Sequence, residues 1–253
     1  MNARFADTAG LLPSAAHGRG TLRNPAGRFE PRQTEVFDDG WGAPEERPLP
    51  PTQVTEEHGK TALTYNTSPD LDFDRTLNPY RGCEHGCIYC YARPSHGYLG
   101  LSAGLDFETR LFAKPDAPKL LEAELRKPGY KPALVLVGAN TDAWQPVERG
   151  LRITRQILET LIAFKHPFGF ISKSALLLRD VDLFAEAARL GICRGYVSVT
   201  TLDASLARKL EPRTAAPQRR LEVLAALAQA GVPVGAMVAP MIPGLNDHEL
   251  EAI

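Results

Sequence analysis

The sequence predicts an α/β protein in which short parallel strands alternate with amphipathic helices. From residue 114 to residue 244, apolar runs of strand length alternate with segments whose apolar residues recur at helical spacing. Two of the helical segments end at a glycine, Gly191 and Gly231, as many helices do. Strands that are separated by helices of this length indicate βαβ units and a parallel sheet.

Each element can be placed along the chain from this pattern. A strand near 75–82 comes first, and a long loop follows it. The later elements are a helix within 114–130, a strand at 133–142, a helix at 147–165, a strand at 167–174, a helix at 180–191, a strand at 194–203, a helix at 216–231 and a strand at 232–244. Arg219 and Arg220 open the last helix, and we expect their stems to pack while their charged heads stay in water. The pattern gives five strands before the sequence stops.

Composition places the chain among ordinary globular proteins. It has 253 residues and a net charge of -1, with 43% hydrophobic and 23% charged residues. The sequence contains no apolar run of membrane-spanning length, and its first residues lack the apolar core of a signal peptide. We therefore expect a cytoplasmic protein without a membrane partner. The net charge leaves nucleic-acid binding open, because a local basic groove can exist in a neutral chain.

The first 60 residues differ in composition from the rest. They are rich in Gly, Pro and charged residues, with arginines concentrated in 19–32 and carboxylates in 35–46. We interpret residues 1–60 as an irregular arm that packs loosely or not at all, and residues 61–253 as the core. An arm that binds nucleic acid or covers an active site is the alternative.

Polar residues follow three of the predicted strands. They occur in the segments Asn140-Thr141-Asp142, Ser172-Lys173-Ser174 and Ser198-Val199-Thr200-Thr201. Ligands of parallel α/β folds bind at the carboxyl ends of the strands, so these segments are expected to meet at one site. A strand near 75–82 would bring the following loop to the same place.

That loop, RGCEHGCIYCYARP, holds three of the four cysteines in the spacing C-x3-C-x2-C. Zinc could bind Cys83, Cys87 and Cys90 with His85 as a fourth ligand. Alternatively, the three thiolates could hold three irons of a [4Fe–4S] cluster and leave the fourth iron for a small molecule. Structural zinc usually uses two separated cysteine pairs, and no second pair exists. Cys193 stands alone at the start of a predicted strand and is expected to be a buried thiol.

The cysteine loop, with Tyr89 before its last cysteine, resembles the signature of the radical S-adenosylmethionine (radical SAM) superfamily. The segments NPYRGCEHGCIYCYARPSHGYLG, NTDAWQPVE, ISKS and LEPRTAAPQRR are more narrowly similar to the branch that contains spore photoproduct lyase and its uncharacterised bacterial relatives. The resemblance covers residues 60–253. It implies a partial (β/α)6 TIM-like barrel, a [4Fe–4S] cluster and S-adenosylmethionine. It also implies an electron donor such as flavodoxin or ferredoxin, and a 5′-deoxyadenosyl radical that abstracts hydrogen from a substrate.

The resemblance assigns roles to individual residues. Cys83, Cys87 and Cys90 would bind the cluster. The implied contacts to S-adenosylmethionine are Tyr89, Tyr91, Thr141, Asp142, Lys173, Ser198, Arg213 and the segment from Ala239 to Gly244. Two of these have ordinary structural alternatives: Asp142 could instead cap a helix or make an Asx turn, and Lys173 could be a solvated surface lysine.

The chain departs from the family pattern in two ways. Spore photoproduct lyase carries a hydrogen-donor cysteine near the tip of the second strand, where this chain reads Gly138-Ala139-Asn140-Thr141-Asp142. The family barrel has six βα units, and five strands are counted here, which predicts a core truncated after the fifth strand. The favoured function is a radical SAM enzyme of unknown substrate. A nucleic-acid substrate, a non-catalytic zinc- or cluster-binding module and an inactive remnant are the alternatives.

Overall fold

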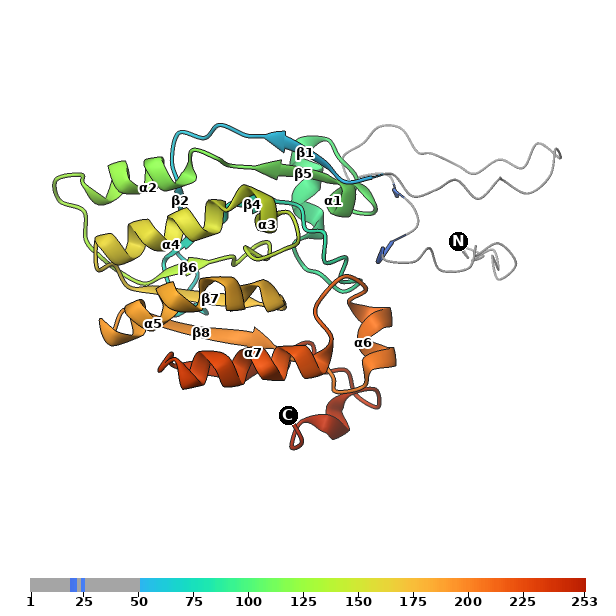
Figure 1. The fold of residues 1–253 in the computed structure, drawn as a ribbon. Coiled ribbons are helices and arrows are strands. Elements are labelled where there is room, and N and C mark those ends of the chain that lie inside the picture. The colour runs from blue at the N-terminus through green and yellow to red at the C-terminus, as the bar shows by residue number, and fades with distance from the viewer. Residues whose placement is uncertain (1–18, 22–23, 26–50) are drawn as a thin grey trace.

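The computed structural model of the chain describes residues 19–21, 24–25 and 51–253. The described strands are β1 (Gln53–Glu56), β2 (Leu63–Tyr65), β3 (Arg75–Leu77), β4 (Tyr80–Arg81), β5 (Arg110–Ala113), β6 (Val135–Val137), β7 (Phe168–Ser172), β8 (Cys193–Ser198) and β9 (Val234–Met237). They form a six-stranded sheet of order β2-β3-β6-β7-β8-β9 and a three-stranded sheet of order β1-β5-β4 (Figure 1).

The five strands predicted from the sequence form the parallel part of the six-stranded sheet. Strands β3, β6, β7, β8 and β9 are parallel neighbours in chain order, and β2 adds an antiparallel edge beside β3. In this register Val135 of β6 pairs with Phe168 of β7, and Phe168 pairs with Cys193 of β8. The carboxyl ends of the strands therefore lie along one edge, as the sequence predicts.

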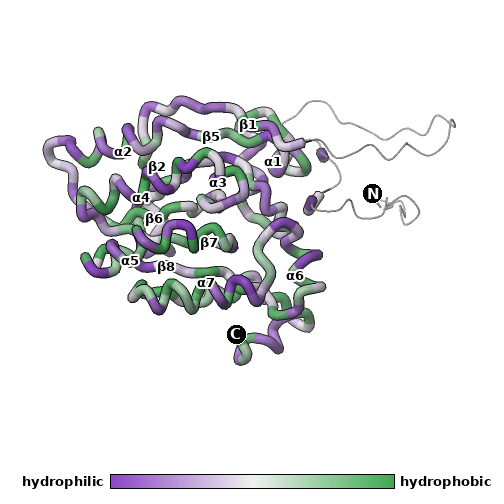
Figure 2. Tube along the Cα trace, in the orientation of Figure 1, coloured by the Kyte–Doolittle hydropathy of each residue, from purple (hydrophilic) through white to green (hydrophobic). Residues whose placement is uncertain are grey.

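The connections between these strands are helical. The α-helices are α1 (Asp106–Thr109), α2 (Ala117–Leu125), α3 (Glu148–Leu151), α4 (Ile153–Ala163), α5 (Val181–Arg189), α6 (Ala204–Leu210) and α7 (Pro217–Gln229), and the 3₁₀-helices are Arg93–Leu99, Ala175–Asp180 and Asp247–Glu249. Neighbouring helices α2, α4, α5 and α7 pack on one another along one face of the sheet (Figure 1). Hydrophilic and hydrophobic residues alternate along α4 and α7, as expected for helices with one face in water (Figure 2).

The core lies between these helices and the sheet. The aromatic rings of Phe170 and Phe184 are 4.4 Å apart between centroids, and Trp144 packs 5.7 Å from Phe170. Trp144 is fully buried and donates its indole N–H to the Asp180 carboxylate at 3.0 Å, so its polar atom is satisfied. Gly195 faces Phe170 across the sheet, where a Cβ would overlap the ring. Glycine at position 195 thus leaves room for the Phe170 ring on the neighbouring strand.

Three predictions about the elements need correction. The helix expected over 147–165 is two helices, because Arg152 takes a left-handed conformation with φ 54° between α3 and α4. Strand β1 lies inside the expected irregular arm and pairs in parallel with β5, so regular structure begins before residue 60. The pattern also missed β2, β5, α1 and α6, which are short. None of the helices in the described part of the chain has the length and apolar character that a bilayer span requires.

Candidate active site

The cysteine loop, defined here as residues 82–91, leaves β4 and leads into the 3₁₀-helix Arg93–Leu99. Gly82 and Gly86 have φ of 75° and 68°, a conformation that glycine adopts at little cost. Both glycines are also closely packed: a Cβ on Gly82 would lie 2.7 Å from Leu111, and one on Gly86 would lie 2.9 Å from the Glu108 carboxylate. Two glycines therefore let this loop turn tightly against its surroundings.

The three cysteines of the loop are free thiols. Cys83 is buried and packs with Phe107, whereas Cys87 and Cys90 are half-buried. Burial raises the pKa of Cys83 well above its usual value and raises that of Cys87 to about 12, although Lys173 opposes the shift at Cys87. The thiols of Cys83 and Cys87 are therefore protonated in the metal-free protein at neutral pH, and metal binding has to displace their protons.

Arg93 holds the loop from the side of the 3₁₀-helix. Its guanidinium donates to the carbonyl of Cys87 at 3.0 and 2.9 Å. The same group pairs with the buried carboxylate of Glu108 at 2.6 Å. Among the described N-terminal positions, Arg19 donates to the Glu108 carbonyl and Gly20 donates its N–H to the Glu108 carboxylate, both at 2.9 Å. This part of the expected loose arm is thus docked behind the loop, while Arg23, Arg28 and Arg32 lie outside the described residues.

Gln145 fixes the opposite end of the loop. Its amide accepts from the backbone N–H of Glu84 at 2.9 Å and donates to the carbonyl of Gly82 at 3.1 Å. The side chain is fully buried, so both bonds are shielded from water. Gln145 belongs to the segment NTDAWQPVE that carries the family resemblance, but its role was not predicted because the contact joins residues 61 positions apart.

The residues after β6 contact the cysteine loop and the next strand. Thr141 is buried and donates its hydroxyl to the Tyr80 carbonyl at 2.8 Å. Asp142 accepts from the N–H of Trp144 and from that of Lys173, both at 2.8 Å, and from the Ser172 hydroxyl at 2.8 Å. The bond to Trp144 is the Asx-turn contact named as the structural alternative for Asp142.

The carboxylate of Asp142 is ionised in this environment. Burial would raise its pKa, but the His85 ring beside it and the backbone donors of Lys173 and Trp144 bring the pKa below its usual value. His85 Nδ1 lies 3.3 Å from Asp142 Oδ2. His85 thus has a local polar partner in Asp142.

The other predicted strand-end residues lie along the same edge. The Lys173 ammonium lies 5.8 Å from the centre of the Tyr89 ring. Ser198 is buried at the end of β8, and its carbonyl accepts from Arg220 at 3.1 Å. The carbonyl oxygen of Ala239 lies 3.3 Å from the Thr200 hydroxyl oxygen. The structure therefore places the ends of β7, β8 and β9 close to the loop or to one another.

The remaining predicted residues differ in exposure. Tyr91 is 77% exposed, and its hydroxyl donates to the Ala139 carbonyl at the tip of β6. Arg213 donates its backbone N–H to the His85 carbonyl at 3.2 Å and pairs with Glu84 at 3.3 Å. Arg213 is thus brought to the loop, but its guanidinium has a carboxylate partner within the protein.

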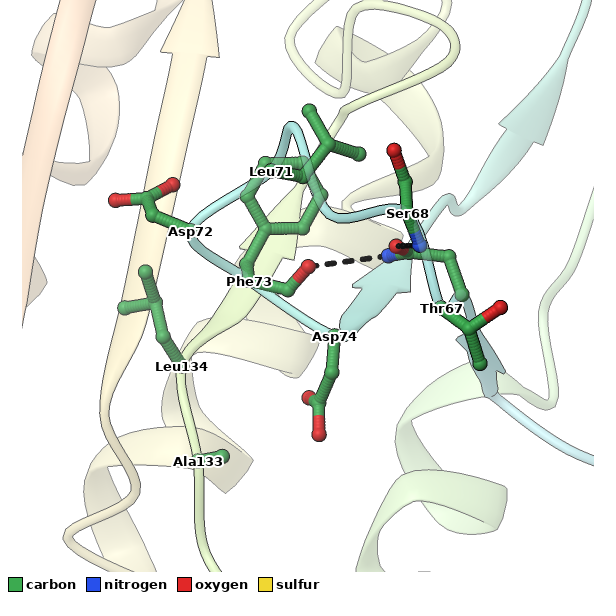
Figure 3. A pocket seen from close by; sticks show the side chains of 9 residues that line it. Thr67, Ser68, Leu71, Asp72, Phe73, Asp74, Ala133 and Leu134 are labelled. Atoms are coloured by element: carbon green, nitrogen blue, oxygen red, sulfur yellow. Dashed lines mark hydrogen bonds between the residues drawn. The ribbon is translucent and has the colours of Figure 1, made fainter.

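Two hollows lie away from these residues. One, of about 400 Å³, is formed largely by the connection between β2 and β3, where Asn66 donates to the Phe73 carbonyl at 3.1 Å (Figure 3). The other, of about 270 Å³, adjoins it and is lined by Leu136, Tyr196 and neighbouring sheet residues. No cysteine lines either hollow. Neither hollow therefore belongs to the cysteine site, which is described by its loop and its strand ends.

The three cysteines of the loop are ligands of the type that binds iron–sulfur clusters. The described residues contain no group of three or more His, Cys, Asp or Glu side chains placed to hold a single metal ion. In a [4Fe–4S] cluster each cysteine binds a different iron, and three cysteines leave one iron open. Three free thiols in eight residues, next to the polar ends of a parallel sheet, fit this requirement.

Comparison with known families decides the ancestry. The model of the radical SAM superfamily matches residues 77–253. The chain belongs to the radical SAM superfamily. The match begins at the last residue of β3 and includes the cysteine loop and all the strand ends described above.

Several uncharacterised proteins are similar to this radical SAM chain. One from Mycobacterium tuberculosis is 40% identical over 177 residues, which cover 70% of this chain and 52% of the relative. One from Acidianus two-tailed virus is 32% identical over 191 residues, covering 72% of this chain and 62% of the relative. This radical SAM chain thus spans about half to three fifths of the length of these curated relatives.

Among solved structures, spore photoproduct lyase in complex with a dinucleoside spore photoproduct is similar in fold. It has a TM-score of 0.57 and 16% identity, with 75% of this chain and 52% of that chain covered. A mutant of spore photoproduct lyase in which serine replaces a cysteine gives 0.56 and 17%, covering 74% and 51%. At this identity the likeness establishes the fold alone.

Proposed function

We propose that this chain is a radical SAM enzyme that binds a [4Fe–4S] cluster through Cys83, Cys87 and Cys90. When bound, the reduced cluster supplies one electron to S-adenosylmethionine, whose cleavage starts hydrogen abstraction from a substrate. The observation that carries the proposal is the position of three free thiols of one loop beside the ends of β6 and β7. An electron donor such as flavodoxin or ferredoxin and a cytoplasmic location belong to the same proposal.

The polar residues at the strand ends would bind S-adenosylmethionine. Lys173 offers a cation beside the Tyr89 ring, which suits the carboxylate of the methionine group. Ser198 is the last residue of β8 and would contact the ribose. Ala239 lies just after β9 and would contact the adenine. Tyr89 and Tyr91 flank Cys90 and would line the same pocket.

Three of the predicted cofactor contacts would act mainly by orienting the site, namely Thr141, Asp142 and Arg213. Each is engaged with the protein: Thr141 with Tyr80, Asp142 with backbone and hydroxyl donors, and Arg213 with Glu84. Their present contacts support a role in orienting the loop and the strand ends toward the cofactor. Direct contacts to the methionine group would use oxygen lone pairs of Asp142 that these donors leave free.

The six-stranded sheet would correspond to a partial (β/α)6 barrel in which five parallel strands are present. This interpretation includes the division into an arm and a core. Its support is the unbroken parallel order β3-β6-β7-β8-β9 and the family match over residues 77–253.

A nucleic acid is the second candidate for the substrate. The structural relative holds a dinucleoside photoproduct, and this chain carries an arginine-rich stretch at residues 19–32. Arg19 is already committed to Glu108 and Thr52, so the other arginines of this stretch would have to contact phosphates. Binding to single- or double-stranded DNA that weakens steeply with salt would support this substrate class.

The decisive experiment is anaerobic reconstitution with iron and sulfide, followed by electron paramagnetic resonance (EPR) of the reduced protein with and without S-adenosylmethionine. We expect a [4Fe–4S] signal that shifts when S-adenosylmethionine is added, because the open iron is then chelated. Production of 5′-deoxyadenosine would follow. One tightly bound zinc per chain and no cluster signal would overturn the proposal and favour a non-catalytic binding module.

A further inference from the structure

The segment from Leu210 to Thr214, called here the backing segment, lies directly behind the cysteine loop. The N–H of Ile88 donates to the Leu210 carbonyl at 3.0 Å, and the N–H of Arg213 donates back to the His85 carbonyl at 3.2 Å. A Cβ on Gly86 would lie 3.3 Å from Pro212. The two stretches are thus packed together over most of their length, although more than a hundred residues separate them in sequence.

A buried ion pair fixes the backing segment to the sheet. Glu211 and Arg220 are 2% and 1% exposed, and their charged groups are in contact. Arg220 comes from α7 and also donates to the Ala215 carbonyl at 2.7 Å and to the Ser198 carbonyl at 3.1 Å. The head of Arg220 is therefore not in water, contrary to the expectation from its place at the start of a helix, whereas Arg219 is exposed as expected.

The same carboxylate receives two hydroxyl groups. Thr200, just after β8, donates to Glu211 Oε1 at 2.6 Å, and Tyr89 of the cysteine loop donates its phenol to the same oxygen. Burial would raise the pKa of Glu211, but Arg220, Lys173 and these hydroxyls bring it below its usual value, so the acceptor is charged. Hydrogen bonds to a charged acceptor are about twice as strong as neutral ones.

We propose that Glu211 is a positioning residue that holds the cysteine loop in its ligand-binding shape through the Tyr89 hydroxyl. Tyr89 stands next to Cys90 and two residues from Cys87, so a fixed phenol restricts both half-buried cysteines. The inference rests on the proposed cluster site, because it assigns Glu211 a purpose at that site. In this arrangement the loop is ordered before any cluster binds, and the cluster does not have to supply the energy of ordering it.

The chain offers a matched control for the hydrogen bond between Tyr89 and Glu211. Tyr80 is buried and donates its hydroxyl to the buried Glu148, which in turn pairs with Arg179 at 2.7 Å. This second Tyr–Glu–Arg set has the same chemistry as the first, but its hydroxyl does not hold the cysteine loop. Tyr89→Phe and Tyr80→Phe therefore remove the same group from equivalent surroundings.

The test compares the loss of iron from the reconstituted variants to a chelator, without S-adenosylmethionine, so that contacts of Tyr89 with the cofactor do not contribute. We expect Tyr89→Phe to lose its cluster at least about tenfold faster than the parent, the lower end of the range for one hydrogen bond to a charged group. Tyr80→Phe should lose it at the parent rate. Glu211→Gln retains a carbonyl acceptor for Tyr89 and should rescue most of the difference seen with Glu211→Ala.

Equal rates for Tyr89→Phe and the parent, or equal acceleration by Tyr80→Phe, would overturn the inference. If Glu211→Ala fails to fold because Arg220 is left unpaired, the double variant Glu211→Leu/Arg220→Met removes both charges and should still lose its cluster quickly. Hydrogen exchange of the metal-free protein separates this inference from the proposed function. Faster exchange of the Ile88 amide in Tyr89→Phe would show that the bond to Glu211 holds the loop, even if no cluster forms. Unchanged exchange would contradict this role.

Discussion

His85 Nδ1 lies 3.3 Å from Asp142 Oδ2, and this contact joins the cysteine loop to the residues that follow β6. Asp142 is buried and also accepts from the N–H of Lys173 and the hydroxyl of Ser172 at the end of β7. One carboxylate therefore links the loop to two strand ends. The Asp142 oxygens accept the hydrogen bonds that these buried donors would otherwise have to make with water.

Replacement of Asp142 by Asn should destabilise the protein. The amide keeps the size of the carboxylate but turns one acceptor into a donor, which then faces the donors of Ser172 or Trp144. We expect a loss of about 3 kcal/mol, measured by urea denaturation, since a buried charge network loses its acceptor. Asp182→Asn is the control, because Asp182 is exposed and its pair with Arg155 is worth less than about 1 kcal/mol. Equal losses in the two variants would contradict this assignment.

Variants of the four cysteines should fall into two groups by the amount of iron that they bind. Cys83→Ala, Cys87→Ala and Cys90→Ala should each prevent stable cluster binding, because a cluster corner loses its ligand. Cys193→Ala should bind iron as the parent does. Cys193 is at the start of β8, at the other end of the sheet, where its thiol contacts the Phe184 carbonyl. Iron and sulfide analysis after anaerobic reconstitution distinguishes the two groups, and retention of a full cluster by Cys87→Ala would refute the ligand set.

The sequence predicted β6, β7 and β8 because each is a mostly buried strand that ends at polar residues. Strand β7, for example, is buried at four of five positions and ends in Ser172. Strand β1 could not be predicted in the same way. It is exposed at all four positions, so it has no detectable apolar pattern.

The site was predicted where a chemical motif is continuous in the sequence and missed where it is assembled by folding. The cysteine spacing and the strand-end residues Thr141, Lys173 and Ser198 are local signals. Gln145 and Glu211 were missed, because a buried Gln or Glu is recognised only from its partners, which are 61 and 122 positions away. Both lie in segments that carried the family resemblance, and that was the available signal.

Acid should destabilise the protein through His96. This histidine is buried with its Nδ1 unpartnered, and burial lowers the pKa of the ring. The folded state therefore binds fewer protons than the unfolded state below the ordinary histidine pKa of about 6.5, and stability falls as the pH drops from that value toward the lower folded pKa. His96→Phe should flatten this loss in denaturation measured across the range.

His58 provides the control for this prediction. It is exposed, and its hydrogen bond to Asp116 raises its pKa, so it has the opposite sign: its contribution is present below the ordinary histidine pKa and is lost as the pH rises through the folded value. His58→Gln should therefore leave the acid-induced loss in place. A slope that disappears with His58→Gln but not with His96→Phe would disprove the assignment to His96.

Gly20 should be sensitive to the smallest substitution. A Cβ on Gly20 would overlap the carbonyl oxygen of Gly86, which is backbone of the cysteine loop and cannot move aside as a flexible side chain could. The Gly20 N–H also donates to the Glu108 carboxylate, which pairs with Arg93. Gly20→Ala should therefore displace residues 19–21 from the loop, increase proteolysis near them and lower the melting temperature.

Gly150→Ala is the matched control for Gly20→Ala. Gly150 lies in α3 with no atom near the position of an added Cβ, and alanine favours a helix by about 0.5–1 kcal/mol over glycine. Gly150→Ala should thus preserve or raise the melting temperature. Because Arg93 holds the Cys87 carbonyl through the same Glu108 group, Gly20→Ala should also increase alkylation of Cys87 in the metal-free protein. Unchanged proteolysis and alkylation in Gly20→Ala would show that the N-terminal residues do not support the loop.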